Sequence, residues 1–435
     1  MSSPQPVNDF SYALRLAQPA PLLVGLSGGL DSTSLLHALA HDDQVRTHGL
    51  RAVHVHHGLQ SAADEWASRC LLLCESLDIQ LQVVAVEVDR LSGEGLEAAA
   101  RKARYGAFER SLGEHEVLVT AHHRDDQAET FLLRALRGSG PDGLAAMRPW
   151  RKFAAGLHWR PLLDTPRSEL LAYAIHHDLA WIEDPSNEDL HHSRNFLRQR
   201  ILPLLRERWP QLDAAFARSA VLSADAVELL ARDDALALAT AQTPDPYAVS
   251  ASALLQLDML RRARVLRRWI DQLGFPPLPG EGVAQLETDL LPARADARAR
   301  FEWRGAVIER WRDLLHVQYL KAPLPADWGV EWDGRGPLPL PGGDVLQLEG
   351  ATALPTPLRV FARRGGERIT LPGRTQSRTL KNVLQQLGIP PWEREVLPLL
   401  SAGDGLVAVA DLAYSDEFDA WLRAAGARLH WRRRQ

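Results

Sequence analysis

The stretch PLLVGLSGGLDSTSLLHALA, residues 21–40, decides the fold of this chain. Its first part, Leu22 to Leu26, is a short apolar run typical of a buried parallel strand, and Leu30 to Ala40 carries apolar residues at helical spacing. Between them, Gly28 and Gly29 allow a tight turn that exposes backbone N–H groups, and the following helix directs the positive end of its dipole at the same point. The stretch therefore predicts a strand, a phosphate-binding turn and a helix.

The turn SGGLDS, residues 27–32, lacks the lysine and the longer glycine spacing of the common ATPase loop GxxxxGK[ST]. It resembles the PP-loop of the ATP-pyrophosphatases, enzymes that cleave ATP between its α- and β-phosphates and adenylate a substrate. This resemblance implies an ATP site formed by Ser27, Gly28, Gly29, Leu30, Asp31 and Ser32. Serine hydroxyls can donate hydrogen bonds to phosphate, and Asp31 can hold the Mg²⁺ that neutralises pyrophosphate. The alternative is a plain glycine turn in which Ser27 caps the helix.

The composition is that of an ordinary globular protein. A length of 435 residues is enough for two or three domains, and 46% of the residues are apolar and 24% charged. The first residues, MSSPQPVNDF, show neither a basic start nor an apolar segment, and no run approaches membrane-spanning length, so we expect a cytoplasmic protein without a membrane partner. Cys70 and Cys74 lie in an expected helix, where we interpret them as packing residues away from the PP-loop.

The net charge of −5 is unevenly distributed along the chain. Residues 359–435 hold 13 basic and 8 acidic residues, a balance of +5, which leaves −10 for the rest of the chain. A basic end on an otherwise acidic chain indicates a polyanionic partner.

Further strand and helix candidates follow the PP-loop in alternation. The expected strands are 49–54, 81–88 and 116–121, and the expected helices between them are 62–77 and 96–112. This alternation predicts an α/β fold, a doubly wound, Rossmann-like parallel sheet with helices on both faces. Ligands of such sheets lie beyond the carboxyl ends of the strands. The candidate site is therefore formed by the polar segments that follow the strands, 27–32, 54–57 and 122–126.

Two segments near this edge allow more than one interpretation. Three histidines of VHVHHGL, residues 53–59, end the second strand. A zinc site is one reading, but neighbours along a strand point to opposite faces, so we expect this strand end to line the nucleotide pocket. One face of the helix at 96–112 carries Glu97, Arg101, Arg104 and Tyr105. This face is either a solvated charged surface or a part of the site.

The segment TAHHRDDQAETF, residues 120–131, joins a strand to a helix. Asp126 and Glu129 lie three residues apart and so share a face in the first turn of that helix. They could form only a capping pair favoured by the helix dipole. Beside an ATP loop, two acidic groups could instead bind an ammonium group or accept its proton, and we favour this functional interpretation.

A later helix begins near Arg194 and carries Arg198 and Arg200 in its first turns. Cations at a helix N-terminus oppose the helix dipole, so we expect an anion beside them, with phosphate as the obvious candidate.

The chain is expected to divide into three domains. Residues 1–215 would form the PP-loop catalytic domain, and residues 216–350 a mainly helical middle domain. A Pro/Gly-rich stretch at 334–343 then precedes a small α+β domain at residues 351–435.

Together these motifs resemble those of the bacterial tRNA(Ile)-lysidine synthase family. The matching pieces are SGGLDS, VHVHHGL, EAAARKARY, TAHHRDDQAET, RGSGPDGL, RPLL, WIEDPSN and RNFLR in the first half, and RRGGER and LKNVLQQLGIPPWEREVLPLL near the end. The resemblance implies a two-step reaction at the wobble cytidine of a CAU anticodon. ATP adenylates the cytosine C2 oxygen and releases pyrophosphate, and the lysine ε-amine then attacks C2 and expels AMP. The product, lysidine, pairs with A, so decoding changes from AUG to AUA.

The same resemblance implies roles for individual residues. Asp126 and Glu129 would bind and activate lysine, while Arg104 and Arg194 would stabilise phosphate charge as it develops. The candidate tRNA contacts are Arg198, Arg363, Arg364, Arg368, Lys381 and Arg394. ATP, Mg²⁺, L-lysine and tRNA(Ile) with a CAU anticodon are the implied ligands, and a homodimer is left open.

Three other functions stay open on the sequence alone. A tRNA thiolase of the same superfamily carries sulfur on cysteines or an iron–sulfur cluster, which Cys70 and Cys74 in a packed helix do not provide. A small-molecule adenylating ligase would not need the basic end of the chain. A catalytically silent tRNA-binding protein would not need the intact acidic and hydroxyl residues of the two motifs.

Overall fold

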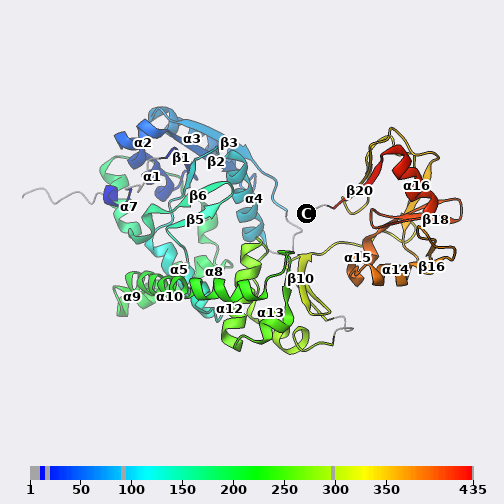
Figure 1. Cartoon of the computed structure of the whole chain (residues 1–435). Helices are drawn as coiled ribbons and strands as arrows, with labels where there is room; N and C mark the ends of the chain where they lie inside the picture. The colour runs from blue at the N-terminus through cyan, green and yellow to red at the C-terminus, as the bar shows by residue number, and fades with distance from the viewer. Residues whose placement is uncertain (1–9, 15–19, 90–94, 295–298, 434–435) are drawn as a thin grey trace, which may run out of the picture. The chain divides into compact units, whose positions relative to one another are not determined.

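The computed structural model of the chain describes residues 10–14, 20–89, 95–294 and 299–433. Most of the segment MSSPQPVNDF, on which the expectation about the N-terminus rests, lies outside these residues. The chain forms two compact units, Met1–Ala231 and Arg232–Gln435 (Figure 1). No helix among the described residues is both long enough and apolar enough to cross a membrane.

A six-stranded sheet forms the centre of the first unit. Its strands are β1 (Leu22–Gly25), β2 (Leu50–His56), β3 (Gln80–Ala85), β4 (Val117–Val119), β5 (Trp150–Phe153) and β6 (Gly156–Trp159). Their order is β3-β2-β1-β4-β6-β5, and all neighbouring pairs are parallel except β5 with β6. The predicted parallel α/β sheet is confirmed. The strand order reverses between β1 and β4, which is where such sheets bind their ligands.

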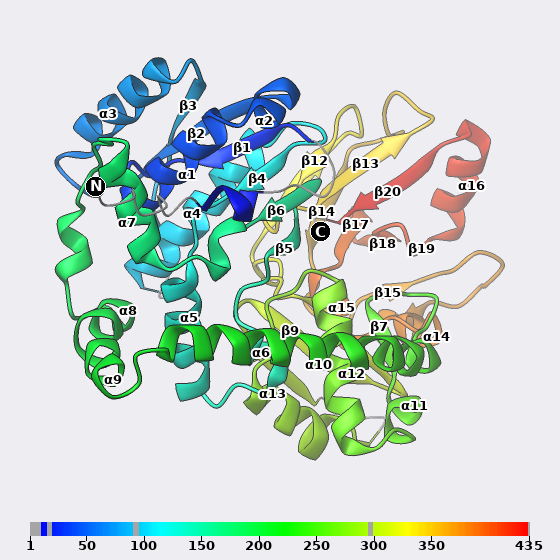
Figure 2. The same ribbon diagram turned by 90° about the vertical axis from the view of Figure 1, so that its left-hand side faces the viewer.

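Helices connect the first five strands, and further helices follow the last strand (Figure 2). The α-helices are α1 (Leu30–Ala40), α2 (Asp43–His48), α3 (Ala63–Ser76), α4 (Leu96–Ser111), α5 (Arg124–Leu136), α6 (Pro141–Leu144), α7 (Arg167–His176), α8 (Ser193–Phe196), α9 (Leu202–Arg208) and α10 (Leu212–Ala241). Short 3-10 or π-helical turns are Phe10–Leu14, Pro161–Asp164, Pro185–Glu188 and Leu197–Ile201.

Alternate residues of β1 belong to two different cores, one on each face of the sheet. Leu22 and Val24 pack with residues of α1, α3 and α7. Leu23 points to the other face, where it packs with Phe108 of α4. All three β1 side chains are fully buried, and each contributes about 1.5–3 kcal/mol through that burial. The strand is therefore anchored from both sides, which holds the loop that follows it in place.

The second unit begins with a helical part that also contains a sheet. Its helical segments are α11 (Ala251–Leu255), α12 (Met259–Gln272), α13 (Gly280–Gln285) and the π-helical turn Leu286–Leu290. Its strands are β7 (Ala248–Ser250), β8 (Arg300–Trp303), β9 (Ala306–Trp311) and β10 (Leu314–Tyr319), which pair antiparallel in the order β7-β10-β9-β8. Helices and sheet share one core around Trp269.

The end of the chain forms a small α+β fold with a separate core. Its strands are β11 (Gly329–Trp332), β12 (Leu338–Pro339), β13 (Val345–Glu349), β14 (Leu358–Ala362), β15 (Arg368–Ile369), β16 (Arg378–Thr379), β17 (Pro398–Ala402), β18 (Gly405–Val409), β19 (Ala413–Tyr414) and β20 (Arg428–Arg432). Its helices are α14 (Leu380–Gln386), α15 (Pro391–Val396) and α16 (Asp416–Ala425).

Pairing within this small fold crosses the expected domain boundary at 350/351. Strand β11 pairs with β14, and β13 pairs with β20, so both sheets use residues from before position 351. The other expected boundary, at 215/216, falls inside the continuous helix α10. The division into three domains stays a prediction.

Candidate active site

The SGGLDS turn connects the buried strand β1 to α1. Gly28 has a φ of +81°, in the left-handed region that favours glycine. The N-cap residue of α1 is Gly29, and no side chain caps the helix, so Ser27 is not the cap. Instead, the Ser27 and Ser32 hydroxyls lie 2.9 Å apart, and Ser32 Oγ accepts the Ser27 N–H at 3.1 Å. The uncapped N-terminus of α1 therefore suits an anion.

The PP-loop is packed closely at Gly28. A Cβ at this position would lie 2.5 Å from Ile182 Cδ1 and 2.9 Å from Cys70 Sγ. Ile182 belongs to the WIEDPSN segment and also donates its N–H to the Gly28 carbonyl at 2.8 Å. Neither the Ile182 contact nor the Cys70 contact was expected from the sequence. They show that position 28 requires glycine because there is no room for a side chain, as well as because of its backbone angle.

The expectation that both cysteines lie away from the loop is wrong for Cys70. Helix α3 packs on the same face of the sheet as α1, and this places the Cys70 thiol against the PP-loop. Burial, together with Cys74, raises the pKa of the Cys70 thiol to about 12. Because a thiol and not a thiolate stands there at neutral pH, Cys70 remains a packing residue.

The carboxyl ends of the neighbouring strands β1 and β4 bring the two main motifs together. Asp31 Oδ2 of α1 lies 3.6 Å from Nε2 of His123, which follows β4. Asp31 Oδ1 lies 3.5 Å from Nε of Arg167 on α7 and has no hydrogen-bond partner among the described residues, although it is buried. A buried carboxylate oxygen without a donor suits a hard cation, so Asp31 fits the expected Mg²⁺ ligand.

Glu129 lies at the centre of a buried charge cluster on α5. Its side chain is 1% exposed, and its two oxygens accept hydrogen bonds from Arg194 Nε at 2.9 Å and Arg198 Nε at 2.6 Å. Arg198 also donates to Asp126 Oδ1 at 3.1 Å. The anions beside the two arginines are therefore carboxylates of α5, where the sequence suggested phosphate. The structure brings together Asp126, Glu129 and Arg194, and it adds Arg198, which was expected to contact tRNA.

Asp126 acts as a helix cap and also belongs to this cluster. Its Oδ2 accepts the backbone N–H of His123 at 3.2 Å, as in the capping interpretation. Burial opposes its ionisation, but the charges of His123 and Arg194 outweigh burial and hold the pKa of Asp126 well below its usual range. Both interpretations of Asp126 are therefore compatible with the structure.

His123 is a charged residue that the sequence analysis did not single out. Burial alone would lower its pKa, but Asp126, Asp125 and Asp31 together raise the pKa of His123 to about 10. Its Nε2 lies between two carboxylates, 3.6 Å from Asp31 and 3.4 Å from Asp126. His123 thus connects the PP-loop to the carboxylate pair. Its place in the polar segment 122–126 was the available signal.

Arg104, the other arginine with an expected catalytic role, contacts the end of β2. Its Nε donates to His57 Nε2 at 3.4 Å. Burial, and then the charge of Arg104, lowers the pKa of His57 to about 4, so this imidazole is neutral. In the same segment His54 Nδ1 lies 2.9 Å from the carbonyl of Leu26, directly before the PP-loop. No group of three or more His, Cys, Asp or Glu residues that could hold a metal occurs among the described residues.

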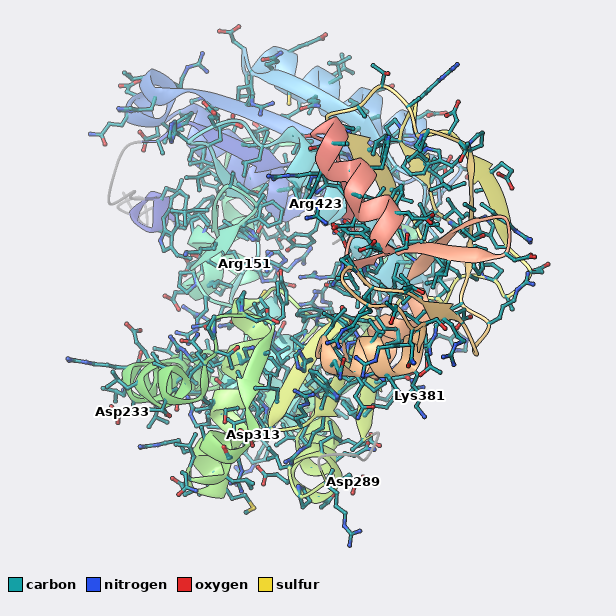
Figure 3. All side chains as sticks on the ribbon, turned by 45° about the vertical axis from the view of Figure 1, so that its right-hand side comes forward. Arg151, Asp233, Asp289, Asp313, Lys381 and Arg423 are labelled. Atoms are coloured by element: carbon teal, nitrogen blue, oxygen red, sulfur yellow. The ribbon has the colours of Figure 1, made fainter. Side chains whose placement is uncertain are left out.

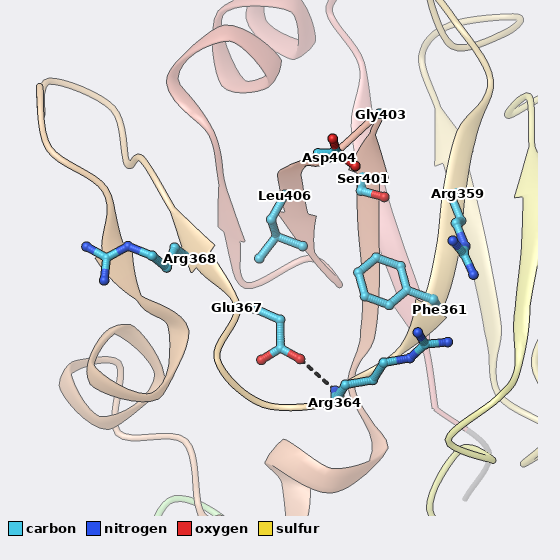
Figure 4. A pocket seen from close by; sticks show the side chains of 9 residues that line it. All are labelled: Arg359, Phe361, Arg364, Glu367, Arg368, Ser401, Gly403, Asp404 and Leu406. Atoms are coloured by element: carbon cyan, nitrogen blue, oxygen red, sulfur yellow. Dashed lines mark hydrogen bonds between the residues drawn. The ribbon is translucent and has the colours of Figure 1, made fainter.

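Two of the expected tRNA contacts border a cavity in the second unit. Arg364 and Arg368 line this cavity of about 240 Å³ together with Arg359 and Phe361 (Figure 4). Glu367 accepts the backbone N–H of Arg364 at 2.6 Å and thereby closes the RRGGER turn. The Arg364 and Arg368 side chains are exposed, as contacts with a large polyanion require.

The other three candidates of the second unit lie near this turn in sequence or on the helices that follow it. Arg363 Nε lies 3.6 Å from Glu367 Oε2, so its charge is partly balanced. Lys381 is exposed on α14 (Figure 3). Arg394 is half-buried and donates to the carbonyl of Ile389 at 2.8 Å. Among these three, Lys381 is the most accessible cation.

Three regions of the chain match known protein families. Residues 5–205 match the family model of the PP-loop domain, residues 250–316 that of the TilS substrate binding domain, and residues 358–431 that of the TilS substrate C-terminal domain. The first match contains the PP-loop and the residues of the charge cluster, from Ser27 to Arg198.

Relatives match over nearly the whole chain. The tRNA(Ile)-lysidine synthase of Xanthomonas axonopodis pv. citri (strain 306) is 52% identical, over 98% of this chain and 97% of the relative. That of Xylella fastidiosa (strain Temecula1) is 50% identical, over 96% of each chain. Among solved structures, the U34-tRNA thiolase NcsA from Methanococcus maripaludis is similar at a TM-score of 0.40 with 18% identity, over 48% of this chain and 77% of the thiolase. The chain therefore belongs to the tRNA(Ile)-lysidine synthase family, and it is an ATP-dependent ligase with a PP-loop domain.

Proposed function

We propose that this enzyme joins L-lysine to C2 of the wobble cytidine in the CAU anticodon of tRNA(Ile), through an adenylate formed with ATP. The observation that carries the proposal is the meeting of two sites at the ends of β1 and β4. One is the uncapped PP-loop helix, and the other is the pair formed by the buried Glu129 and the partly buried Asp126. His123 bridges them at 3.6 and 3.4 Å, so an adenylate formed at one site lies within reach of an amine bound at the other.

The first step uses the PP-loop. Cytosine O2 is a poor nucleophile and a worse leaving group, so it must be activated before an amine can replace it. O2 attacks the α-phosphorus of ATP, and the bond to pyrophosphate breaks. The N-terminus of α1 and the hydroxyls of Ser27 and Ser32 would hold the phosphates during this step. Mg²⁺, which Asp31 would hold, supplies positive charge that stabilises the departing pyrophosphate.

The second step uses the carboxylate pair. Lysine arrives as an ammonium with a pKa of about 10.4 and must lose a proton before its nitrogen can attack C2. A carboxylate with a strongly lowered pKa binds an ammonium well but takes its proton poorly, so we assign Asp126 to binding. Glu129, the other carboxylate of the pair, would then accept the proton that the ammonium loses. Attack then forms the N–C2 bond and breaks the C2–O2 bond, and AMP departs with O2 on its phosphate.

The arginines that bind Glu129 indicate how lysine could enter the site, by exchange of a guanidinium for the lysine ammonium. Both Glu129 oxygens already accept guanidinium hydrogen bonds, at 2.9 Å from Arg194 and 2.6 Å from Arg198. A lysine ammonium carries the same charge, so it can replace one guanidinium at little electrostatic cost. The displaced Arg194 would then be free to meet the phosphate of the departing AMP, which is the role expected for it.

The anticodon must be held while its base leaves the stack. The exposed Arg364, Arg368 and Lys381 of the second unit are the proposed backbone contacts. Arg104, beside His57, would stabilise phosphate charge as it develops. Because the substrate is a tRNA, we infer that the enzyme works in the cytoplasm.

Incorporation of radiolabelled lysine tests the proposal directly. Unmodified tRNA(Ile) with a CAU anticodon is incubated with enzyme, ATP and Mg²⁺, and elongator tRNA(Met) with the same anticodon is the control. Label on tRNA(Ile) alone supports reaction, substrate and discrimination together. If ATP is cleaved to AMP without label on either tRNA, the substrate assignment is wrong. Asp31→Asn should reduce pyrophosphate release by about 10²- to 10³-fold if Asp31 acts at the phosphates.

A further inference from the structure

A chain of hydrogen bonds runs from the surface of the sheet to the site. Arg151 Nε donates to Nδ1 of His158 at 3.1 Å, and Arg160 Nη2 lies 3.2 Å from the same nitrogen. Nε2 of His158 lies 2.8 Å from Thr120 Oγ1. The same hydroxyl lies 2.8 Å from Nδ1 of His122. The chain therefore links β6, which carries His158, to the end of β4 (Arg151 is labelled in Figure 3).

The chemistry of the two arginines fixes the direction of every bond in this chain. A guanidinium only donates, so His158 Nδ1 must accept and carries no proton. A neutral His158 then has its proton on Nε2 and donates it to Thr120 Oγ1. The two imidazoles are the only hydrogen-bond partners of Thr120 Oγ1 among the described residues. The hydroxyl therefore satisfies its own proton by donating it to Nδ1 of His122. The remaining proton of a neutral His122 must therefore lie on Nε2.

Both imidazoles are held in the neutral form. His158 is fully buried, and burial, followed by the charges of Arg160 and Arg151, lowers its pKa to about 2. Burial likewise lowers the pKa of His122 to about 3, although Asp126 opposes this. A neutral imidazole has one N–H, so the nitrogen that carries it decides whether the ring offers the site a donor or an acceptor.

We propose that Thr120 and His158 are positioning residues that hold His122 with its proton on Nε2, and that His122 donates this N–H to an oxygen of the adenylated cytidine. Nε2 of His122 has no hydrogen-bond partner among the described residues. The ring stands in the segment between β4 and α5, close enough to feel the charges of Asp126 and Arg194. The identity of the acceptor rests on the proposed function, whereas the hydrogen-bond chain does not.

Thr120→Val breaks the series of hydrogen bonds with little change in the shape of the side chain. Thr120→Ser keeps the hydroxyl and is the matched control. We expect Thr120→Val to lower kcat about 10- to 100-fold, the range seen when an orienting partner is removed, with KM for ATP little changed. Thr120→Ser should retain clearly more activity than Thr120→Val. Thr47→Val, which removes a hydroxyl from the exposed face of α2, should leave activity unchanged. Melting temperatures of all variants show whether any loss reflects unfolding.

Nitrogen-15 NMR of histidine-labelled full-length enzyme without substrates tests the tautomer itself. His122, identified by the signals lost in His122→Gln, should show a protonated Nε2 and an unprotonated Nδ1. In Thr120→Val the tautomers should become mixed. A protonated Nδ1 in the wild-type enzyme would overturn the proposal even if the enzyme makes lysidine. If the wild-type spectrum shows a protonated Nε2 but the enzyme forms no lysidine, the series of hydrogen bonds is supported and the proposed function is rejected.

Two substitutions of His122 separate its nitrogens. The side-chain amide of glutamine can place an N–H near the position of Nε2, whereas that of asparagine lies near Nδ1. We therefore expect His122→Gln to keep more activity than His122→Asn. Because glutamine has no tautomer to fix, adding Thr120→Val to His122→Gln should cause a much smaller further loss than in the wild type. Equal losses in both backgrounds, or greater activity of His122→Asn, would show that Thr120 does not act through His122.

Discussion

Replacing Glu129 by glutamine would test the buried charge cluster. The substitution keeps the shape but removes the charge that faces Arg194 and Arg198, and it turns one acceptor into a donor that meets a guanidinium. Three hydrogen bonds of 2.6–3.0 Å end on the Glu129 carboxylate. Breaking a buried ion pair typically costs about 3–5 kcal/mol. Since the two guanidiniums are partly exposed and Asp126 still faces them, we expect the lower end, about 3 kcal/mol.

Calorimetry can measure this loss in the transition of the first unit. A cost of about 3 kcal/mol corresponds to a decrease in Tm of about 6–12 °C for a unit of this size. Glu65→Gln is the matched control, because Glu65 pairs with Arg69 on an exposed helix surface, where such pairs contribute less than about 0.5 kcal/mol. Lysine use should also fall more than tRNA binding. A decrease in Tm no larger than that of the control would refute the view that the cluster stabilises the fold.

Three further predictions test other parts of the structure. Gly28→Ala should abolish ATP cleavage, because the new Cβ would lie 2.5 Å from Ile182 and the φ of residue 28 is +81°. The control Gly58→Ala should retain ATP cleavage, because Gly58 has a φ of +60° but open space around it. Replacing Arg364 and Arg368 by alanine should weaken tRNA binding and flatten its dependence on salt, by about 0.7–0.9 in the log–log slope for each phosphate that is no longer neutralised; an unchanged slope would remove them from the interface. Glu116 pairs with Arg51, whose Nε donates to it at 2.6 Å, and it also accepts the backbone N–H of Gly113 at 2.6 Å. Burial would raise the pKa of Glu116, but these hydrogen bonds lower it below its usual value. The stability that this pair contributes is therefore present above about pH 4.5 and lost at more acidic pH, so the wild-type Tm should fall more steeply on acidification than that of Glu116→Gln.

The parts of the fold that depend on nearby residues could be predicted from the sequence. The PP-loop, its strand and its helix lie within one stretch of 20 residues, and α1 spans Leu30–Ala40 as expected. The predicted parallel sheet also follows from local patterns, because apolar runs alternate with amphipathic helices. The position of the site follows from the general rule that ligands lie at the carboxyl ends of parallel strands. None of these inferences needs knowledge of which distant residues touch.

Contacts between distant residues could not be predicted in the same way. Positive charges at a helix start indicate an anion, but nothing local shows that the anion beside Arg198 is Glu129, 69 residues away. Likewise, the spacing of Cys70 within its helix indicates burial without showing that its thiol meets Gly28. The link from Thr120 to His158 joins the end of β4 to β6. Thr120 begins the TAHHRDDQAET segment, but His158 belongs to no motif, so the sequence does not show that the two residues meet. Such pairings depend on how the strands are ordered in the sheet.

The charge cluster reconciles two roles that the sequence assigned separately. Asp126 and Glu129 were expected to bind an ammonium, and Arg194 was expected to meet phosphate, yet here they bind each other. Two carboxylates that lie side by side without cations would repel each other. Resident guanidiniums balance the charge of the pair before lysine arrives, since they supply the same positive charge that an ammonium brings. An arginine is suited to this exchange because it keeps its own charge when it leaves, and that charge can then stabilise a phosphate.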